Sequence, residues 1–267
     1  MIYSYTQISQ YLRCPKQYRY RYLDGWREKD TRASAVFGRC FEKALTAYFA
    51  NEDCSIALFK EWAAYRNTAL EYGRSDSWDR MLQQGIHLLH LFAQNDRVRI
   101  SEPDRDLQIK VTRQLPHGNA FVAVLDAVGR IDGRRYLIDW KTTSSRYTEE
   151  PDGLWSMDPQ LTCYAWISGI RDVSMVVFVR KKLPEIQYLR TTISEEQINE
   201  YGHLVQATIR QIEAGSFPPH SGIRFPMNGC TTCSYWGLCL KNQRLIESTL
   251  TRRPGASDLD WLDELSE

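Results

Sequence analysis

The chain has 267 residues, of which 43% are hydrophobic and 25% charged, and its formal net charge is +1. These values are ordinary for a soluble globular protein. No run approaches the roughly 20 apolar residues that cross a bilayer, and the first residues lack the apolar core of a signal peptide. We therefore expect a cytoplasmic protein with no membrane partner, whose seven cysteines serve as metal ligands, catalytic groups or buried side chains rather than disulfides. A phosphate-binding G-x-x-x-x-G-K-S/T loop is missing from the sequence, which argues against an ATP-driven motor.

The first third of the chain is predicted to be mainly helical. Thr6 is expected to cap a short helix, and Pro15 fits the first turn of a second one. Apolar residues at helical spacing predict longer helices over residues 35–50, 54–71 and 77–95.

From residue 97 onward the pattern changes to strands. Alternating or continuous apolar runs predict strands at 107–111, 120–128, 136–138, 173–179 and 186–190, with helices at 158–169 and 194–214. Asp132-Gly133 is a hairpin turn signal. The order indicates an α/β fold with a mixed central sheet flanked by helices. We expect one domain over 1–245, with a mainly helical part (1–96), a core sheet (97–192) and a C-terminal helix with a cysteine-rich region (193–245), followed by a linker and acidic tail (246–267).

Two aspartates and a lysine interrupt the apolar runs of the predicted hairpin. Asp126 and Asp139 are nearly equidistant from the turn, so antiparallel pairing places them opposite each other. Side chains alternate along a strand, so Lys141 shares the face of Asp139. Paired carboxylates repel unless a cation neutralises them, and oxygen ligands favour Mg²⁺ or Mn²⁺. Such an ion polarises a phosphate and activates water, which the lysine can orient. The alternative is a solvated hairpin face.

Four cysteines lie at the two ends of the chain: Cys14, then Cys230, Cys233 and Cys239. Four thiolates suit either tetrahedral zinc or a [4Fe–4S] cluster, and the spacing does not choose between them. Either group would act as a structural staple, because its binding energy becomes folding energy. Cys40, Cys54 and Cys163 are expected to be small buried residues, and His87 and His90 to be packed helix histidines rather than metal ligands.

Two segments suggest interaction surfaces. Residues 13–32 place arginines and lysines among tyrosines, a composition that suits a path for single-stranded nucleic acid or a basic helix face with tyrosines packed inward. Residues 258–265 mix leucines and a tryptophan with carboxylates. This tail could dock as a short helix on a protein partner, mask the basic face of its own chain, or be a frayed end.

The ordered set of motifs resembles the RecB-type nucleases of the PD-(D/E)XK superfamily. The matching residues are Gly38 to Glu42, Asp126, the string Ile138-Asp139-Trp140-Lys141-Thr142-Thr143, and Gln160 with Tyr164. The cysteines resemble the iron–sulfur subset, which includes CRISPR-associated adaptation nucleases and AddB-type nuclease domains. The resemblance implies a restriction-endonuclease-like sheet and a [4Fe–4S] cluster bound by the four cysteines.

The resemblance also implies residue roles. Asp126 and Asp139 would bind the metal together with the backbone carbonyl of Trp140, and Lys141 would be the catalytic lysine. Gln160 and Tyr164 would contact DNA or order the site. Glu42 stands where many relatives carry histidine. A carboxylate also binds metal, so metal preference or ion number could differ.

Together these features predict a Mg²⁺- or Mn²⁺-dependent deoxyribonuclease, more exonuclease than endonuclease, acting on single-stranded DNA ends or overhangs. One alternative is a catalytically silent nucleic-acid-binding subunit of a helicase–nuclease or CRISPR adaptation complex. Another is a zinc-stapled, sequence-specific restriction-type endonuclease.

Overall fold

The computed structural model describes residues 1–29, 31–151, 153–219 and 229–253. The chain divides into two compact units. The first unit comprises residues 1–30, 114–122 and 203–267, and the second comprises 31–113 and 123–202. The single domain expected over 1–245 stays a prediction, and the acidic tail at 258–265 lies outside the described residues.

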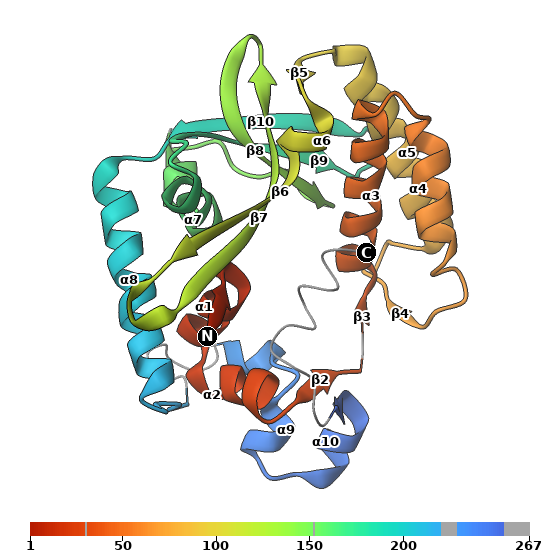
Figure 1. The fold of residues 1–267 in the computed structure, drawn as a ribbon. Helices are drawn as coiled ribbons and strands as arrows, with labels where there is room; N and C mark the ends of the chain where they lie inside the picture. Colours follow the sequence, from red (N-terminus) through yellow and green to blue (C-terminus); the bar gives the residue numbers. More distant parts are fainter. Residues whose placement is uncertain (30, 152, 220–228, 254–267) are drawn as a thin grey trace. The chain divides into compact units, whose positions relative to one another are not determined.

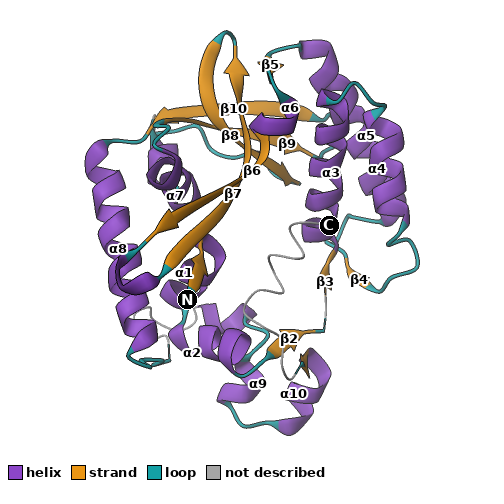
Figure 2. Ribbon diagram, viewed as in Figure 1, coloured by secondary structure: helices purple, strands orange, loops and turns teal. Residues whose placement is uncertain are grey.

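A mixed sheet forms the centre of the second unit. Its strands follow the order β7 (Ala120–Ile131), β8 (Arg134–Thr143), β9 (Asp172–Val179) and β10 (Glu185–Thr192), while β5 (Val98–Arg99) and β6 (Leu107–Gln114) also pair with β7. β7 and β8 are antiparallel, β8 and β9 parallel, and β9 and β10 antiparallel. Figure 2 shows these strands in orange. The mixed α/β fold predicted from the sequence is confirmed.

The turn between β7 and β8 fixes the register of the hairpin. Ile131 pairs with Arg134, so Asp132 and Gly133 form a two-residue turn, and both have positive φ, at 51° and 83°. Positive φ at both central positions is the geometry of the tight hairpin turn that Asp-Gly favours. The predicted turn is confirmed, and it determines which residues of the two strands face each other.

Three helices, α3 (Ala33–Phe49), α4 (Cys54–Ala63) and α5 (Trp78–Asn95), pack side by side in the second unit (Figure 1). Aromatic side chains join them to the sheet. Phe92 of α5 packs edge-on against Trp140 of β8, with ring centroids 6.0 Å apart, and both contact Phe178 of β9. The helix predicted over 54–71 ends earlier, at Ala63, where the Tyr65 and Arg66 N–H groups form tight turn bonds to the Trp62 and Ala63 carbonyls. Leu70–Glu71 then forms strand β4, which pairs with β3 (Thr31–Arg32).

Three shorter helical segments complete the second unit. They are α6 (Pro103–Asp106), a 3₁₀ turn (Leu154–Met157) and α7 (Pro159–Ser168). Helix α8 (Glu195–Glu213) begins in this unit and continues into the first. Trp166 of α7 packs edge-to-face on Tyr201 of α8.

The first unit gathers the two ends of the chain. β1 (Ile2–Ser4) runs parallel to the start of β7, and β2 (Trp26–Glu28) pairs with β11 (Leu250–Arg252). The remaining elements are α1 (Tyr5–Arg13), α2 (Pro15–Tyr18), a π-helical turn (Arg19–Leu23), 3₁₀ turns at Pro116–Gly118 and Gly229–Thr232, α9 (Trp236–Cys239) and α10 (Gln243–Thr249).

The cap predicted for the first helix was wrong by two residues. Ser4, not Thr6, caps α1. The Ser4 hydroxyl accepts from the Gln7 amide at 3.3 Å, and the Gln7 side chain accepts from the Ser4 amide at 2.9 Å. This reciprocal capping box needs a Gln or Glu three residues after the cap, and Gln7 supplies it.

The remaining expectations for cysteine and histidine gave mixed outcomes. Cys40, Cys54 and Cys163 are buried, as expected. His87 and His90 are exposed, so their predicted packing is wrong: they lie on the outer side of α5, where the His90 Nε2 is 3.0 Å from the Ser55 hydroxyl. None of the helices in the described part of the chain is long and apolar enough to span a membrane.

Candidate active site

The β7–β8 hairpin brings Asp126 and Asp139 together. Counted from the turn, the last pair of the ladder is Ala127 with Ile138, and Asp126 and Asp139 are the next residues of the two strands beyond it. There the Asp126 Oδ2 accepts a hydrogen bond from the backbone N–H of Trp140 at 2.9 Å. Because the N–H and C=O of one strand residue point to the same side, the Trp140 carbonyl is also directed toward β7. The expected proximity of the two aspartates is confirmed.

Lys141 is held by a chain of polar contacts. Its Nζ lies 3.0 Å from both carboxylate oxygens of Asp139 and donates to the Gln160 Oε1 at 2.9 Å. The Gln160 Nε2 in turn donates to the Tyr164 hydroxyl at 2.8 Å. Gln160 lies in the first turn of α7, which is capped by the Asp158 carboxylate. The helical spacing of Gln160 and Tyr164 thus lets both act on the position of the lysine.

Glu42 reaches the same site from α3. It is half-buried and shares a hydrogen bond with the Asp126 carboxyl group, and it accepts another from the Gln108 amide. All six residues predicted for the site (Glu42, Asp126, Asp139, Lys141, Gln160 and Tyr164) therefore lie within one connected cluster. Gln108 belongs to that cluster and was not predicted.

Burial and mutual repulsion raise the pKa values of the acids. Burial and then the charge of Glu42 raise the pKa of Asp126 to about 7. Asp139, which is fully buried, has its pKa raised to about 7 by burial and by Asp126. The pKa of Glu42 is raised as well, chiefly by burial. Without a cation, the cluster therefore retains protons near neutral pH.

The pKa of Lys141 changes in the opposite sense to that of most buried amines. Burial lowers it, but the charges of Asp139 and Asp126 together outweigh burial and leave it raised. The ammonium group is therefore charged at neutral pH. Tyr164 is buried beside the same acids. Burial, and then the charges of Asp126 and Asp139, raise its pKa well above the usual value. Its hydroxyl therefore stays protonated.

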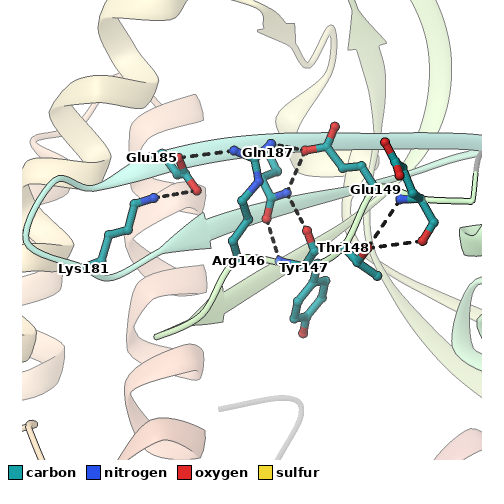
Figure 3. Close-up of polar contacts among 8 residues, drawn as sticks. Arg146, Tyr147, Thr148, Glu149, Lys181, Glu185 and Gln187 are labelled. Atoms are coloured by element: carbon teal, nitrogen blue, oxygen red, sulfur yellow. Dashed lines mark hydrogen bonds and ion pairs between the residues drawn. The ribbon is translucent and has the colours of Figure 1, made fainter.

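The loop between Lys141 and Gln160 is fastened to the edge strand β10 (Figure 3). The buried side-chain amide of Gln187 accepts from the Tyr147 N–H at 2.9 Å and donates to the Tyr147 carbonyl at 3.0 Å. Arg146 bridges Glu149 and Glu185, and Lys181 pairs with Glu185 at 2.8 Å. These contacts restrain the connection between the strand that carries Lys141 and the helix that carries Gln160.

The carboxylates of the acidic cluster have the chemistry that a divalent cation requires. The Asp139 Oδ2 is buried, and the Lys141 ammonium lies 3.0 Å from it. Neighbouring carboxylates whose pKa values are raised by burial and by one another suit a hard divalent ion, which would neutralise their charge. In the described residues, however, no three His, Cys, Asp or Glu side chains are gathered in an arrangement that could hold a metal ion. Asp126 and Asp139 would hold such an ion between them, and Glu42 lies beside Asp126.

Comparison with known proteins decides the family. Residues 2–240 match the model of the PD-(D/E)XK nuclease superfamily. The chain belongs to this superfamily. No curated protein matches it. Among solved structures, a provisionally named exonuclease from Eubacterium rectale aligns with a TM-score of 0.51 at 13% identity, covering 97% of this chain and 91% of that one. This likeness shows the fold alone.

Two further structures match less well. SSO0001 has a TM-score of 0.34 at 14% identity and covers 88% of this chain and 94% of its own. LHK-Exo in complex with dAMP has a TM-score of 0.33 at 12% identity, covering 68% and 93%. At these TM-scores neither match carries an argument. The PD-(D/E)XK superfamily assignment, and with it a nuclease function, rests on the family model.

The four cysteines of this PD-(D/E)XK protein lie in the first unit. Cys14 stands between α1 and α2. Burial and then the nearby Cys14 and Cys239 raise the pKa of the Cys233 thiol, and the Cys239 Sγ is 3.9 Å from the Tyr20 hydroxyl. Cys14 and Cys239 thus lie near enough to Cys233 to affect its thiol. Over the described residues they do not form a closed ligand set.

Gln160 offers a first test of the site. Replacing Gln160 with alanine removes the side-chain oxygen that accepts a hydrogen bond from Lys141. The ammonium group is then positioned by its contact with Asp139 without that second partner. We expect turnover to fall about 10–100-fold, the range for partners that orient functional groups, while the affinity for divalent metal stays unchanged. Steady-state kinetics and metal titration measure the two effects. An equal loss of metal affinity would contradict the assigned role.

Proposed function

We propose that the chain is a Mg²⁺- or Mn²⁺-dependent deoxyribonuclease that hydrolyses phosphodiester bonds at single-stranded DNA ends or overhangs. The observation that supports it most is the pairing of Asp126 and Asp139 beside a charged lysine, with the pKa values of both carboxyl groups raised by burial and by neighbouring acids. Two buried carboxylates repel each other unless a cation neutralises them, and the single charge of Lys141 balances only one of them.

Each residue of the cluster has a place in the proposed reaction. A divalent ion on Asp126, Asp139 and the Trp140 carbonyl would supply Lewis-acid chemistry at the scissile phosphate. Lys141, held between Asp139 and Gln160, donates hydrogen bonds to the attacking water or to the developing negative charge. Gln160 and Tyr164 fix the direction of that ammonium, and Glu42 supports Asp126.

The preference for single strands rests on the first unit. Lys16 lies over the ring of Tyr20, with its Nζ 5.9 Å from the centroid, and Arg21 lies over Tyr22 at 5.7 Å. Cations beside aromatic rings suit phosphates and stacked bases. The tyrosines of this stretch are not all available, since Tyr18 is buried. Basic and aromatic side chains thus support the proposal at some positions and a packed helix face at others.

We also propose that Cys14, Cys230, Cys233 and Cys239 bind a [4Fe–4S] cluster with a structural role. Burial and the nearby Cys14 and Cys239 raise the pKa of the Cys233 thiol, and a bound metal group would neutralise the thiolate charge gathered there. Anaerobic purification should yield about four irons and four sulfides per chain. Cys233→Ser should lower both counts and the thermal stability. Stoichiometric zinc without sulfide would contradict the cluster and favour a zinc staple.

Metal dependence tests the enzymatic proposal. Labelled single-stranded DNA should be degraded in the presence of Mg²⁺ or Mn²⁺. A chelator should abolish the degradation, and adding the metal ion back should restore it. A duplex without overhangs and a closed circle serve as controls, because the circle offers no end. Rapid cleavage of the circle would contradict the exonuclease mode. Metal-independent binding without cleavage would support the catalytically silent subunit instead.

A further inference from the structure

Gln108 has a backbone conformation that its residue type disfavours. Its φ is +49°, in the left-handed region where the Cβ of a non-glycine residue is crowded. Leu107 before it is extended, with φ −116°, and ends α6 through a bond from its N–H to the Pro103 carbonyl. Gln108 then enters β6. Glycine and asparagine adopt this conformation more readily, but position 108 carries glutamine.

The side chain of Gln108 contacts the candidate active site. Its Nε2 donates a hydrogen bond to the Glu42 Oε1, across 66 positions of sequence. Gln108 itself is exposed, whereas Glu42 is half-buried. The contact therefore lies at the outer edge of the cluster and joins β6 to α3, both in the second unit.

The Glu42 carboxyl group is thereby held from two sides. Gln108 donates to it, and Asp126 shares a hydrogen bond with it. A glutamate side chain has three rotatable bonds and samples several rotamers when nothing restrains it. An amide donor on one oxygen restricts these rotamers to those that face Asp126. Backbone strain commonly persists where the surrounding structure uses it to aim a functional group.

We propose that Gln108 is a positioning residue that orients Glu42 beside Asp126 and so prepares the acidic cluster for a divalent cation. This inference rests on the proposed function, because it assumes that the cluster binds metal. Partners that orient metal ligands typically change metal affinity 10–100-fold. The strained backbone of Gln108 is then retained for its contact with Glu42 rather than for folding.

Gln108→Gly tests the proposal because stability and metal affinity should change independently. Glycine removes the amide and also the backbone strain. We expect the Kd for Mn²⁺, measured by calorimetry, to rise about tenfold. The thermal midpoint of the metal-free protein should stay unchanged or rise by up to about 4 °C. Asn51→Gly is the matched control, since Asn51 is also an amide residue with positive φ, at 62°, and lies in the same unit. It should leave the Mn²⁺ affinity as in the wild type.

Three outcomes separate this inference from the function on which it rests. If Asp139→Asn abolishes Mn²⁺ binding and Gln108→Gly weakens it while the midpoint holds, the proposal is supported. If Asp139→Asn abolishes binding but Gln108→Gly binds Mn²⁺ as tightly as the wild type, the positioning role is overturned and the proposed function stands. If Asp139→Asn binds Mn²⁺ normally, the cluster is not the metal site, and both fail.

Discussion

Asp139→Asn and Lys141→Ala are each expected to reduce hydrolysis of single-stranded DNA by about 10³-fold or more, with the fold retained. Asparagine keeps the shape of Asp139 but removes the negative charge that a divalent ion requires. Alanine removes the ammonium group that Asp139 and Gln160 hold in place. Single-turnover cleavage of an end-labelled strand at saturating Mn²⁺ measures the chemical step directly.

Matched controls isolate the site from general effects of charge. Asp79→Asn and Lys60→Ala make the same chemical changes at exposed positions of α5 and α4 in the same unit. Both should retain wild-type activity. If Asp139→Asn or Lys141→Ala cleaves as fast as its control, the assignment of that residue fails.

The same Asp139→Asn variant is expected to be more stable than the wild type when no metal is present. The folded-state pKa of Asp139 is raised from 3.8 to about 7. The folded protein therefore binds a proton more tightly than the unfolded chain, and its stability falls as pH rises from about 4 to about 7. Asparagine has no such penalty. The gain should be absent near pH 4 and complete above pH 7, where we expect about 2 kcal/mol after allowing for the weakened Lys141 contact.

Thermal unfolding in a chelating buffer at pH 5 and pH 8 measures this effect. A gain of about 2 kcal/mol corresponds to a midpoint about 4–8 °C higher at pH 8, with a smaller difference at pH 5. Adding Mn²⁺ should raise the midpoint of the wild type but not that of the variant, because only a protein that binds the ion is stabilised by it. A variant that is less stable at pH 8 would contradict the buried, repulsive environment of Asp139.

Local sequence patterns predicted the part of the site that depends on one hairpin. The Asp132-Gly133 turn fixes the register, and the register brings Asp126 and Asp139 together just beyond the last pair, Ala127 with Ile138. The four-residue spacing of Gln160 and Tyr164 likewise placed them on one face of α7. The sequence did not reveal that Gln160 contacts Lys141, because that contact depends on the loop fastened to β10 by Gln187.

Features that depend on distant packing were missed. Gln108 has no motif, and its role follows from a positive φ and a contact with a helix 66 positions earlier. Strand β1 was not predicted, since a three-residue strand is stabilised by pairing with β7 rather than by its own pattern. His87 and His90 were expected inside because leucines surround them, but three-residue spacing placed both on the outer side of α5.

The central claim is that Asp126 and Asp139 bind one divalent ion beside Lys141. A crystal structure of the protein soaked in Mn²⁺, with anomalous diffraction measured at the manganese edge, tests it most directly. We predict an anomalous peak for a manganese ion that lies about 2.0–2.2 Å from oxygens of both aspartates, in the range of hard-cation coordination. An absence of signal at these carboxylates in crystals that bind manganese elsewhere would contradict the claim.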